Sequence, residues 1–182
     1  MSAQMLSIDG FRGTDLRWVQ PKALVRRHEL RSGKDLYATL KWVGLLGSVV
    51  EAATADGRFT LRRGGFLRPL VTVRDAALGS EVAMLKLGFF GHGTLEFTNG
   101  RRVTVRSNRF WSYEWNLLDE GGRLLCKIKK RFGFVMETGD VMIAELVRRD
   151  RDLLVMLAAS WYAMVLMGEQ AATAVVAAGA SR

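Results

Sequence analysis

Residues 150–170 read DRDLLVMLAASWYAMVLMGEQ, and the centre of this stretch, Leu153 to Met167, is apolar on every side. A helix that is apolar all round lies either in lipid or inside a large protein core. At 1.5 Å per residue the run is about 22 Å long, and crossing a bilayer takes about 20 apolar residues. Extending the run toward Ala180 would place Glu169 in the middle of the span, where a carboxylate is costly. The sequence therefore favours a helix enclosed by protein over a tail anchor.

The rest of the chain predicts the enclosure. Turn signals such as ADG (55–57) and TNG (98–100) separate short segments in which apolar and polar residues alternate. In DLYATLKW (35–42) the even positions share one face and Tyr37, Thr39 and Lys41 share the other. Period-two alternation indicates strands with one buried and one wet face. We count about ten to twelve such strands between residues 16 and 147, and a sheet of this size is expected to curl or close.

The predicted fold is therefore mainly β, a closed antiparallel barrel of about twelve strands that encloses a hydrophobic C-terminal helix. It forms one domain, 1–182, with a core over about 16–168, while 1–15 and 171–182 could be flexible. The alanine-rich tail could extend the helix or hang free. The helix residues expected to fill the barrel are Leu153, Leu154, Leu157, Trp161, Met164 and Val165. Ser160 and Tyr162 would each need a hydrogen-bond partner in such a core.

The composition bears on partners and compartment. The chain carries a formal net charge of +9, which favours anionic partners such as a lipid surface, nucleic acid or an acidic protein. The bland alternative is a soluble surface that happens to be basic. Cys126 is the single cysteine and cannot form an internal disulfide, which fits a reducing compartment. The first fifteen residues show no signal peptide, so we expect a cytoplasmic protein.

Four stretches carry a family resemblance: DLYATLKW, ADGRFTLRRGGF, FTNGRRVTVRSNRFWSYEWNLLDEGGRLLCKIKK and DRDLLVMLAASWYAMVLM. A long β meander that ends in one hydrophobic helix resembles the tubby C-terminal-like superfamily, which includes phospholipid scramblases and LURP-one-related proteins. The likeness is greatest to small bacterial tubby-like proteins. The resemblance implies a twelve-stranded barrel threaded by the helix. The tubby phosphoinositide-binding Lys/Arg set, the scramblase front end and an acidic calcium loop have no match here, so no residues are carried over.

We find no catalytic constellation in the sequence. His28 and His92 lack a second ligand at metal-binding spacing, so neither a metal site nor a cofactor is expected. Cys126 falls on the apolar face of its segment, which indicates an inert core thiol. Trp111, Tyr113 and Trp115 share one face opposite polar residues, and a core stripe is a better interpretation than a base-stacking surface. An enzyme and a nucleic-acid binder are therefore both disfavoured.

The basic residues are the one feature of the sequence that points to a binding surface. Arg102 and Arg106 share a polar strand face, as do Lys127, Lys129 and Arg131 on a nearby segment. Together these five could hold phosphate oxygens on the outer wall of the barrel. The alternative is a solvated sheet exterior whose lysines and arginines guard strand edges.

Three functions remain open at this stage. The leading hypothesis is a non-enzymatic module that binds anionic phospholipid headgroups through the basic barrel face, peripherally at the membrane. The second is a structural or regulatory protein that binds a protein partner or a small apolar molecule. The third is a scramblase-like or tail-anchored membrane protein.

Overall fold

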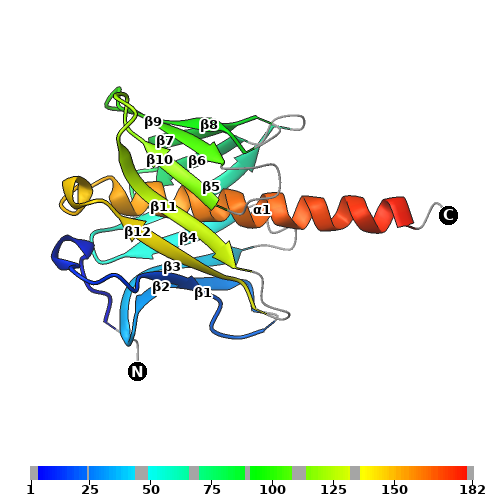
Figure 1. Ribbon diagram of the computed structural model, residues 1–182, viewed down its shortest axis with the longest axis horizontal. Coiled ribbons are helices and arrows are strands. Elements are labelled where there is room, and N and C mark those ends of the chain that lie inside the picture. The colour runs from blue at the N-terminus through cyan, green and yellow to red at the C-terminus, as the bar shows by residue number, and fades with distance from the viewer. Residues whose placement is uncertain are drawn as a thin grey trace.

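In a computed structural model the chain forms a closed antiparallel barrel of twelve strands around one long helix (Figure 1). The structure describes residues 4–23, 25–43, 49–65, 70–88, 91–107, 114–131 and 136–179, the last nine of these by backbone only. The strands are β1 (Arg17–Val19), β2 (Arg27–Ser32), β3 (Asp35–Val43), β4 (Val49–Thr54), β5 (Arg58–Gly64), β6 (Leu70–Asp75), β7 (Glu81–Leu87), β8 (Gly93–Phe97), β9 (Arg102–Ser107), β10 (Glu114–Leu118), β11 (Leu124–Arg131) and β12 (Thr138–Ile143). The remaining elements are two short 3₁₀ helices, η1 (Ile8–Gly10) and η2 (Glu145–Val147), and the helix α1 (Leu153–Gly179).

Each strand pairs with its neighbours in sequence, and β1 closes the barrel by pairing with β12. The alternation read from the sequence is the reason these segments form strands. In β9, for example, Val103 and Val105 are fully buried while Arg102 and Arg106 are exposed. Closure leaves no free sheet edge, which removes the aggregation hazard of a long open meander. The predicted barrel is thus confirmed.

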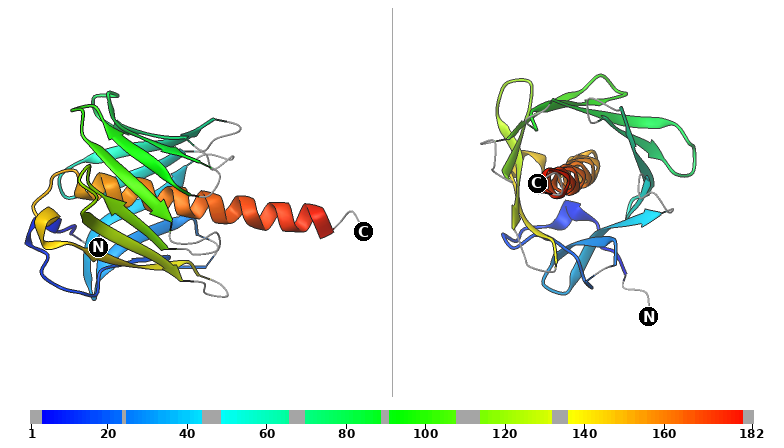
Figure 2. Two further views of the ribbon diagram at one scale, coloured as in Figure 1. Left: turned by 45° about the horizontal axis from the view of Figure 1, so that its top comes forward. Right: turned by 90° about the vertical axis from the view of Figure 1, so that its right-hand side faces the viewer.

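Helix α1 runs along the inside of the barrel, and the view along its axis shows the strands encircling it (Figure 2). Every residue from Leu153 to Leu166 is buried. By length and composition Leu153–Gln170 could cross a membrane, but most of this segment is enclosed by the barrel. Because the barrel wall surrounds the helix on all sides from Leu153 to Leu166, every face of this apolar stretch is removed from water.

The N-terminal segment covers part of the outer wall. Met5 bridges to Leu36, and Phe11 packs edge-to-face on Tyr37 with ring centroids 5.6 Å apart. Tyr37 points to the outer side of β3, as its position in the alternation predicts, yet only 6% of it is exposed. The expectation of a wet face at Tyr37 is therefore wrong, because Phe11 and its neighbours shield it.

The barrel has two distinct ends. At one end α1 begins, and we call it the helix-start end. There Arg101 forms ion pairs with Asp150 at 2.6 Å and Asp152 at 3.1 Å, which ties the β8–β9 turn to the chain just before the helix. At the other end α1 leaves the barrel and projects beyond it (Figure 1), and we call this the helix-exit end.

Candidate functional site

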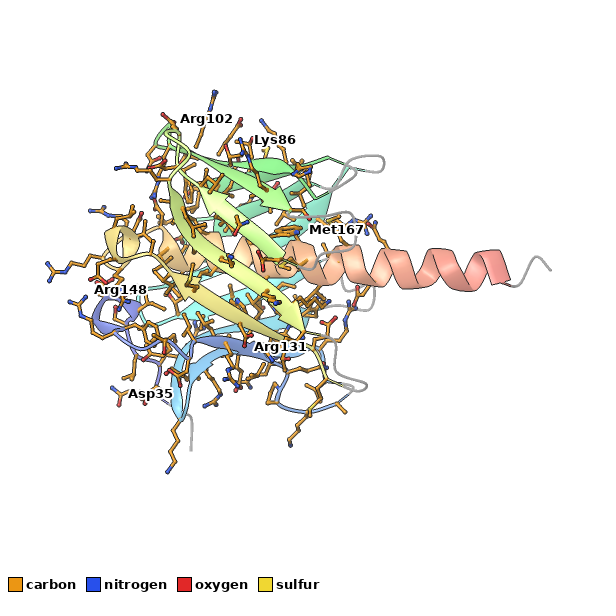
Figure 3. The ribbon with its side chains drawn as sticks, in the orientation of Figure 1. Asp35, Lys86, Arg102, Arg131, Arg148 and Met167 are labelled. Carbon is orange, nitrogen blue, oxygen red and sulfur yellow. The ribbon has the colours of Figure 1, made fainter. Side chains whose placement is uncertain are left out.

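The five basic residues predicted to bind phosphate lie on the outer wall. Arg102 and Arg106 come from β9, and Lys127, Lys129 and Arg131 come from β11. Strand β10 separates the two sets, since Asn116 is paired with Arg106 on one side and Lys127 on the other. Figure 3 shows Arg102 pointing away from the barrel, and Arg131 is exposed. Two strand spacings put the sets about 10 Å apart, so they occupy one wall without converging on a point.

Carboxylates interrupt this wall. Lys127 forms an ion pair with Glu114 at 3.2 Å, and Arg131 forms one with Asp140 at 2.5 Å. Arg102 lies 4.0 Å from Glu96, a carboxyl whose pKa is lowered mainly by its hydrogen bond from Lys86. Three of the five predicted phosphate ligands are thus satisfied across the sheet. The wall therefore resembles a solvated sheet surface on which opposite charges pair, and it does not resemble a site that concentrates positive charge for an anion.

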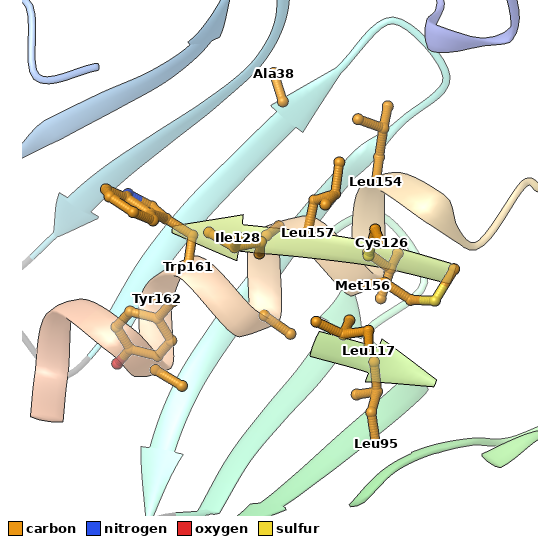
Figure 4. Packing of buried hydrophobic residues seen from close by; sticks show 14 of the residues in the cluster. Ala38, Leu95, Leu117, Cys126, Ile128, Leu154, Met156, Leu157, Trp161 and Tyr162 are labelled. Atoms are coloured by element: carbon orange, nitrogen blue, oxygen red, sulfur yellow. The ribbon is translucent and has the colours of Figure 1, made fainter. Parts of the chain in front are cut away.

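The helix residues predicted to fill the core do so. Leu153, Leu157 and Trp161 are completely buried, and Leu154, Met164 and Val165 are at most 5% exposed. Figure 4 shows Leu154, Leu157 and Trp161 among side chains of the surrounding strands. Tyr162 finds a hydrogen bond with the backbone of Arg63, as a buried phenol requires. The hydroxyl of Ser160 has no partner among the described residues.

A buried polar cluster lies where the helix leaves the barrel. We call it the exit cluster: His28, Lys130, Glu137 and Trp161. The indole Nε1 of Trp161 donates to His28 Nδ1 at 2.6 Å, and His28 Nε2 lies 3.5 Å from Glu137 Oε2. The other carboxylate oxygen of Glu137 accepts from Lys130 Nζ at 2.5 Å. Because only 3% of the Lys130 side chain is exposed, this ion pair sits at the inner surface of the wall.

His28 is neutral in this arrangement. Burial lowers its pKa to about 4, with further lowering by the charges of Lys130 and Arg26. Since Nδ1 accepts a hydrogen bond from the indole, the single ring proton belongs on Nε2, which faces Glu137. The histidine is therefore a fixed acceptor for the helix, and it is not poised to exchange protons near neutral pH.

Arginine side chains hold the helix as it emerges. Arg26 forms an ion pair with Glu169 at 2.6 Å, and its guanidinium lies 5.6 Å from the centre of the Trp42 ring. The amide of Gln170 faces the guanidinium of Arg63. A small pocket of about 130 Å³ opens beside these groups. Its lining residues are Gln20, Arg26, His28, Trp42, Glu137, Val165 and Glu169.

A second hollow, of about 250 Å³, lies on the outer wall over β4, β5 and β6. It is lined by Val49, Thr60, Arg62, Thr72 and Arg74. The two arginines alternate with two threonines because Thr60 is paired with Arg74 and Arg62 with Thr72. Guanidinium and hydroxyl groups in this pattern can hydrogen-bond an anion. Val49 is the first residue of β4 and is paired with Arg62, so the hollow begins at the helix-exit end of these strands.

The other side chains that could react, Cys126 and His92, lie in structural environments. Cys126 is completely buried, and burial raises the pKa of its thiol to about 12. His92 accepts a hydrogen bond from the backbone of Ser107 at 3.3 Å. Within the described ranges no three histidine, cysteine or acidic residues gather as metal ligands. Of the predicted aromatic stripe, Trp115 is buried as expected, while Trp111 and Tyr113 lie outside the described residues.

The exit cluster is the part of the site that reasoning from the sequence missed. Its signal was present in the alternation: Lys130 occupies the same strand face as Cys126 and Ile128, and His28 shares a face with Leu30. A lysine at an inward position was hidden among outward lysines in the run KIKKR. The carboxylate that pairs with it, Glu137, lies across the β11–β12 connection and could not be matched to it from sequence alone.

Comparison of the chain with models of protein families, with curated proteins and with solved structures finds no match. The resemblance to the tubby C-terminal-like superfamily thus remains a prediction based on the order of strands and helix.

Proposed function

We propose that this protein is a non-enzymatic binding module that associates peripherally with anionic phospholipid surfaces in the cytoplasm. The observation that carries the proposal is the unequal charge of the two barrel ends. The sequence segments that join strands at the helix-exit end are 20–26, 44–48, 65–69, 88–92, 108–113 and 132–137. Those at the helix-start end are 33–34, 55–57, 76–80, 98–101, 119–123 and 144–152.

The two sets of segments differ sharply in composition. At the helix-start end, six lysines and arginines are balanced by six aspartates and glutamates. In the sequence segments of the helix-exit end, four basic residues, Lys22, Arg26, Arg68 and Arg109, stand against the single carboxylate Glu137. Arg68 and Arg109 lie outside the described residues, and Arg26 also pairs with Glu169 of α1. The excess positive charge of the joining segments is therefore concentrated at one end, as an electrostatic attachment to a negatively charged surface requires.

This placement differs from the one expected from the sequence. The outer wall with Lys127, Lys129 and Arg131 was the predicted phosphate-binding face, but its charges are largely paired. A basic residue near an anionic membrane contributes about 1 kcal/mol of attraction when no neighbouring carboxylate cancels it. Among the described residues Lys22 meets that condition, since it forms no ion pair, whereas Arg26 is paired with Glu169.

Vesicle co-sedimentation tests the proposal. We expect the protein to bind vesicles with about 30% phosphatidylserine at low salt, to release them at about 0.5 M salt, and to ignore pure phosphatidylcholine. The double variant Lys22→Glu/Arg68→Glu should weaken binding by about tenfold or more. Its control, Arg106→Glu/Lys129→Glu on the outer wall, changes the net charge equally and should weaken binding much less. Binding that ignores the anionic lipid would overturn the proposed function.

A further inference from the structure

The segments that join strands at the helix-exit end are also the more apolar set by sequence. By sequence, its joining segments contain fifteen large apolar residues (Val, Leu, Met, Phe, Trp or Tyr), while those of the helix-start end contain three. Turns between strands are ordinarily polar and rich in glycine, asparagine and aspartate. The helix-start end follows this rule with TNG and DEGG, whereas the helix-exit end carries strings such as GFLRP and GFFGH. Thirteen of the fifteen lie outside the described residues, so the contrast is drawn from the sequence. Apolar residues concentrated in this way are typical of a surface that meets a partner.

Two of these apolar residues, Val25 and Met136, are described, and a glutamine links the two segments that carry them. Gln20 donates from Nε2 to the carbonyl of Val25 at 3.0 Å, and its Oε1 accepts from the backbone of Glu137 at 3.1 Å. Gln20 thereby ties the β1–β2 and β11–β12 segments to each other. Val25 and Met136, in those two segments, are each 45% exposed. Val25 directly precedes Arg26, which pairs with Glu169, and Met136 directly precedes Glu137, so exposed apolar side chains adjoin charged ones in both segments.

Helix α1 adds a projecting apolar element at the same end. It continues for nine residues beyond Gln170, over the sequence AATAVVAAG, and Figures 1 and 2 show it extending past the strands. Nine residues extend about 14 Å, and none of them is charged. A bilayer core is about 30 Å thick, so these nine residues match about the thickness of one leaflet.

We infer that the helix-exit end inserts into the interface of an anionic bilayer, with Val25, Met136 and the tail 171–179 entering the lipid. Lys22 of the same end then lies at the level of the phosphates, together with Arg26 and its partner Glu169. This docking mode rests on the proposed function and identifies the face that performs it. It also orients the barrel, because α1 must point toward the membrane.

Charge favours a lipid surface over a second copy of the chain as the occupant. Two helix-exit ends brought together would face each other with excess positive charge, which opposes self-association. An anionic bilayer attracts the same charge and also accepts the apolar residues, as in other proteins that lie in the membrane interface. The two parts of the surface, cationic and apolar, thus both match a single partner.

Single-cysteine labelling distinguishes the two ends. Cys126 is buried and unreactive, so a cysteine introduced on the surface takes up a polarity-sensitive nitrobenzoxadiazole dye selectively. Val25→Cys and Met136→Cys report on the helix-exit end. Leu78→Cys and Leu146→Cys, at exposed apolar positions of the helix-start end, are the matched controls. With anionic vesicles we expect a several-fold rise in dye emission and a blue shift for the first pair, and no change for the second.

The outcomes separate the inference from the proposed function. Co-sedimentation with no emission change at any of the four positions would mean that the outer wall docks, which overturns the insertion while leaving lipid binding intact. A change at Leu78→Cys or Leu146→Cys would overturn the orientation. Emission that rises with protein concentration in the absence of vesicles would identify a second copy as the occupant and overturn the inference. Failure to sediment with any vesicle would remove the proposed function itself.

Discussion

The indole nitrogen of Trp161 donates a 2.6 Å hydrogen bond to Nδ1 of His28, joining the centre of α1 to the inner face of β2. The Trp161 ring also stacks on Trp18, with centroids 6.0 Å apart and planes 7° from parallel. On a helix that is apolar all round, burial alone does not select one rotation about the helix axis. A directional hydrogen bond and a flat stacking contact do select one, and both belong to Trp161.

Gly139 supplies the space for that ring. A Cβ atom at this position would lie 2.8 Å from Cη2 of Trp161, and closer still to another ring atom, which is inside any normal contact distance. We therefore expect Gly139→Ala to lower the free energy of unfolding by about 1–3 kcal/mol, as overpacking of a core does. The control is Gly57→Ala, where the nearest atoms are 3.7 Å or more away. Urea denaturation of both variants measures the difference, and equal stability would mean that Trp161 does not lie against β12.

Acid should lower the free energy of unfolding through protonation of His28. Its pKa is lowered to about 4 from a usual 6.5, so below pH 6.5 the unfolded chain binds a proton that the folded chain resists. The stability from this group is complete above pH 6.5 and is lost as the pH falls toward 4, by roughly 3 kcal/mol in all. The variant His28→Gln keeps a hydrogen-bond acceptor and does not titrate. The wild-type protein should lose more unfolding free energy than this variant between pH 7 and pH 4, and identical pH profiles would contradict the buried neutral histidine.

The two neighbouring lysines of β11 should respond very differently to removal of their charge. Lys130→Met leaves Glu137 without its ion-pair partner in the exit cluster. We expect a loss of about 1–3 kcal/mol, below the value for a fully buried pair because Glu137 is one-third exposed. Lys129→Met, at an exposed outward position, should change stability by less than about 0.5 kcal/mol. A larger loss at residue 129 than at residue 130 would mean that the register of β11 is shifted by one residue.

The thiol of Cys126 should be inert in the folded protein. It is completely buried and its pKa is about 12, so almost no reactive thiolate is present at neutral pH. Reaction with Ellman's reagent should be slow under native conditions and fast in denaturant. Rapid native labelling would show that the wall around β11 opens, and it would also remove the selectivity on which the dye experiment depends.

The barrel could be predicted from the sequence because local patterns encode it. Alternation in segments such as 102–107 and the all-round apolarity of 153–167 each admit few structures, and together they require a closed sheet around a helix. The shielding of Tyr37 could not be predicted, since it depends on where Phe11 lands after folding. The pairing of the outer-wall cations depends in the same way on strand register, which fixes Glu114 opposite Lys129 and within reach of Lys127.

The exit cluster could likewise be predicted only in part from the sequence. The alternation places Lys130 inward. A lysine is tolerated there because it pairs with Glu137, a carboxylate from another segment that also lies near His28 of β2. The contrast between the two barrel ends could also be predicted only in part. The sequence of each segment is plain, yet only the antiparallel topology sorts the twelve segments into one apolar, basic set and one polar, balanced set.

Hydrogen–deuterium exchange along α1 tests the central claim most directly, because that claim divides one helix into an enclosed part and a projecting part. The account predicts slow exchange over 153–166 with or without vesicles, and fast exchange over 171–179 that slows only when anionic vesicles are added. Fast exchange over 153–166 in the free protein would contradict the enclosed helix. Exchange over 171–179 that stays fast on vesicle-bound protein would contradict insertion of the helix-exit end.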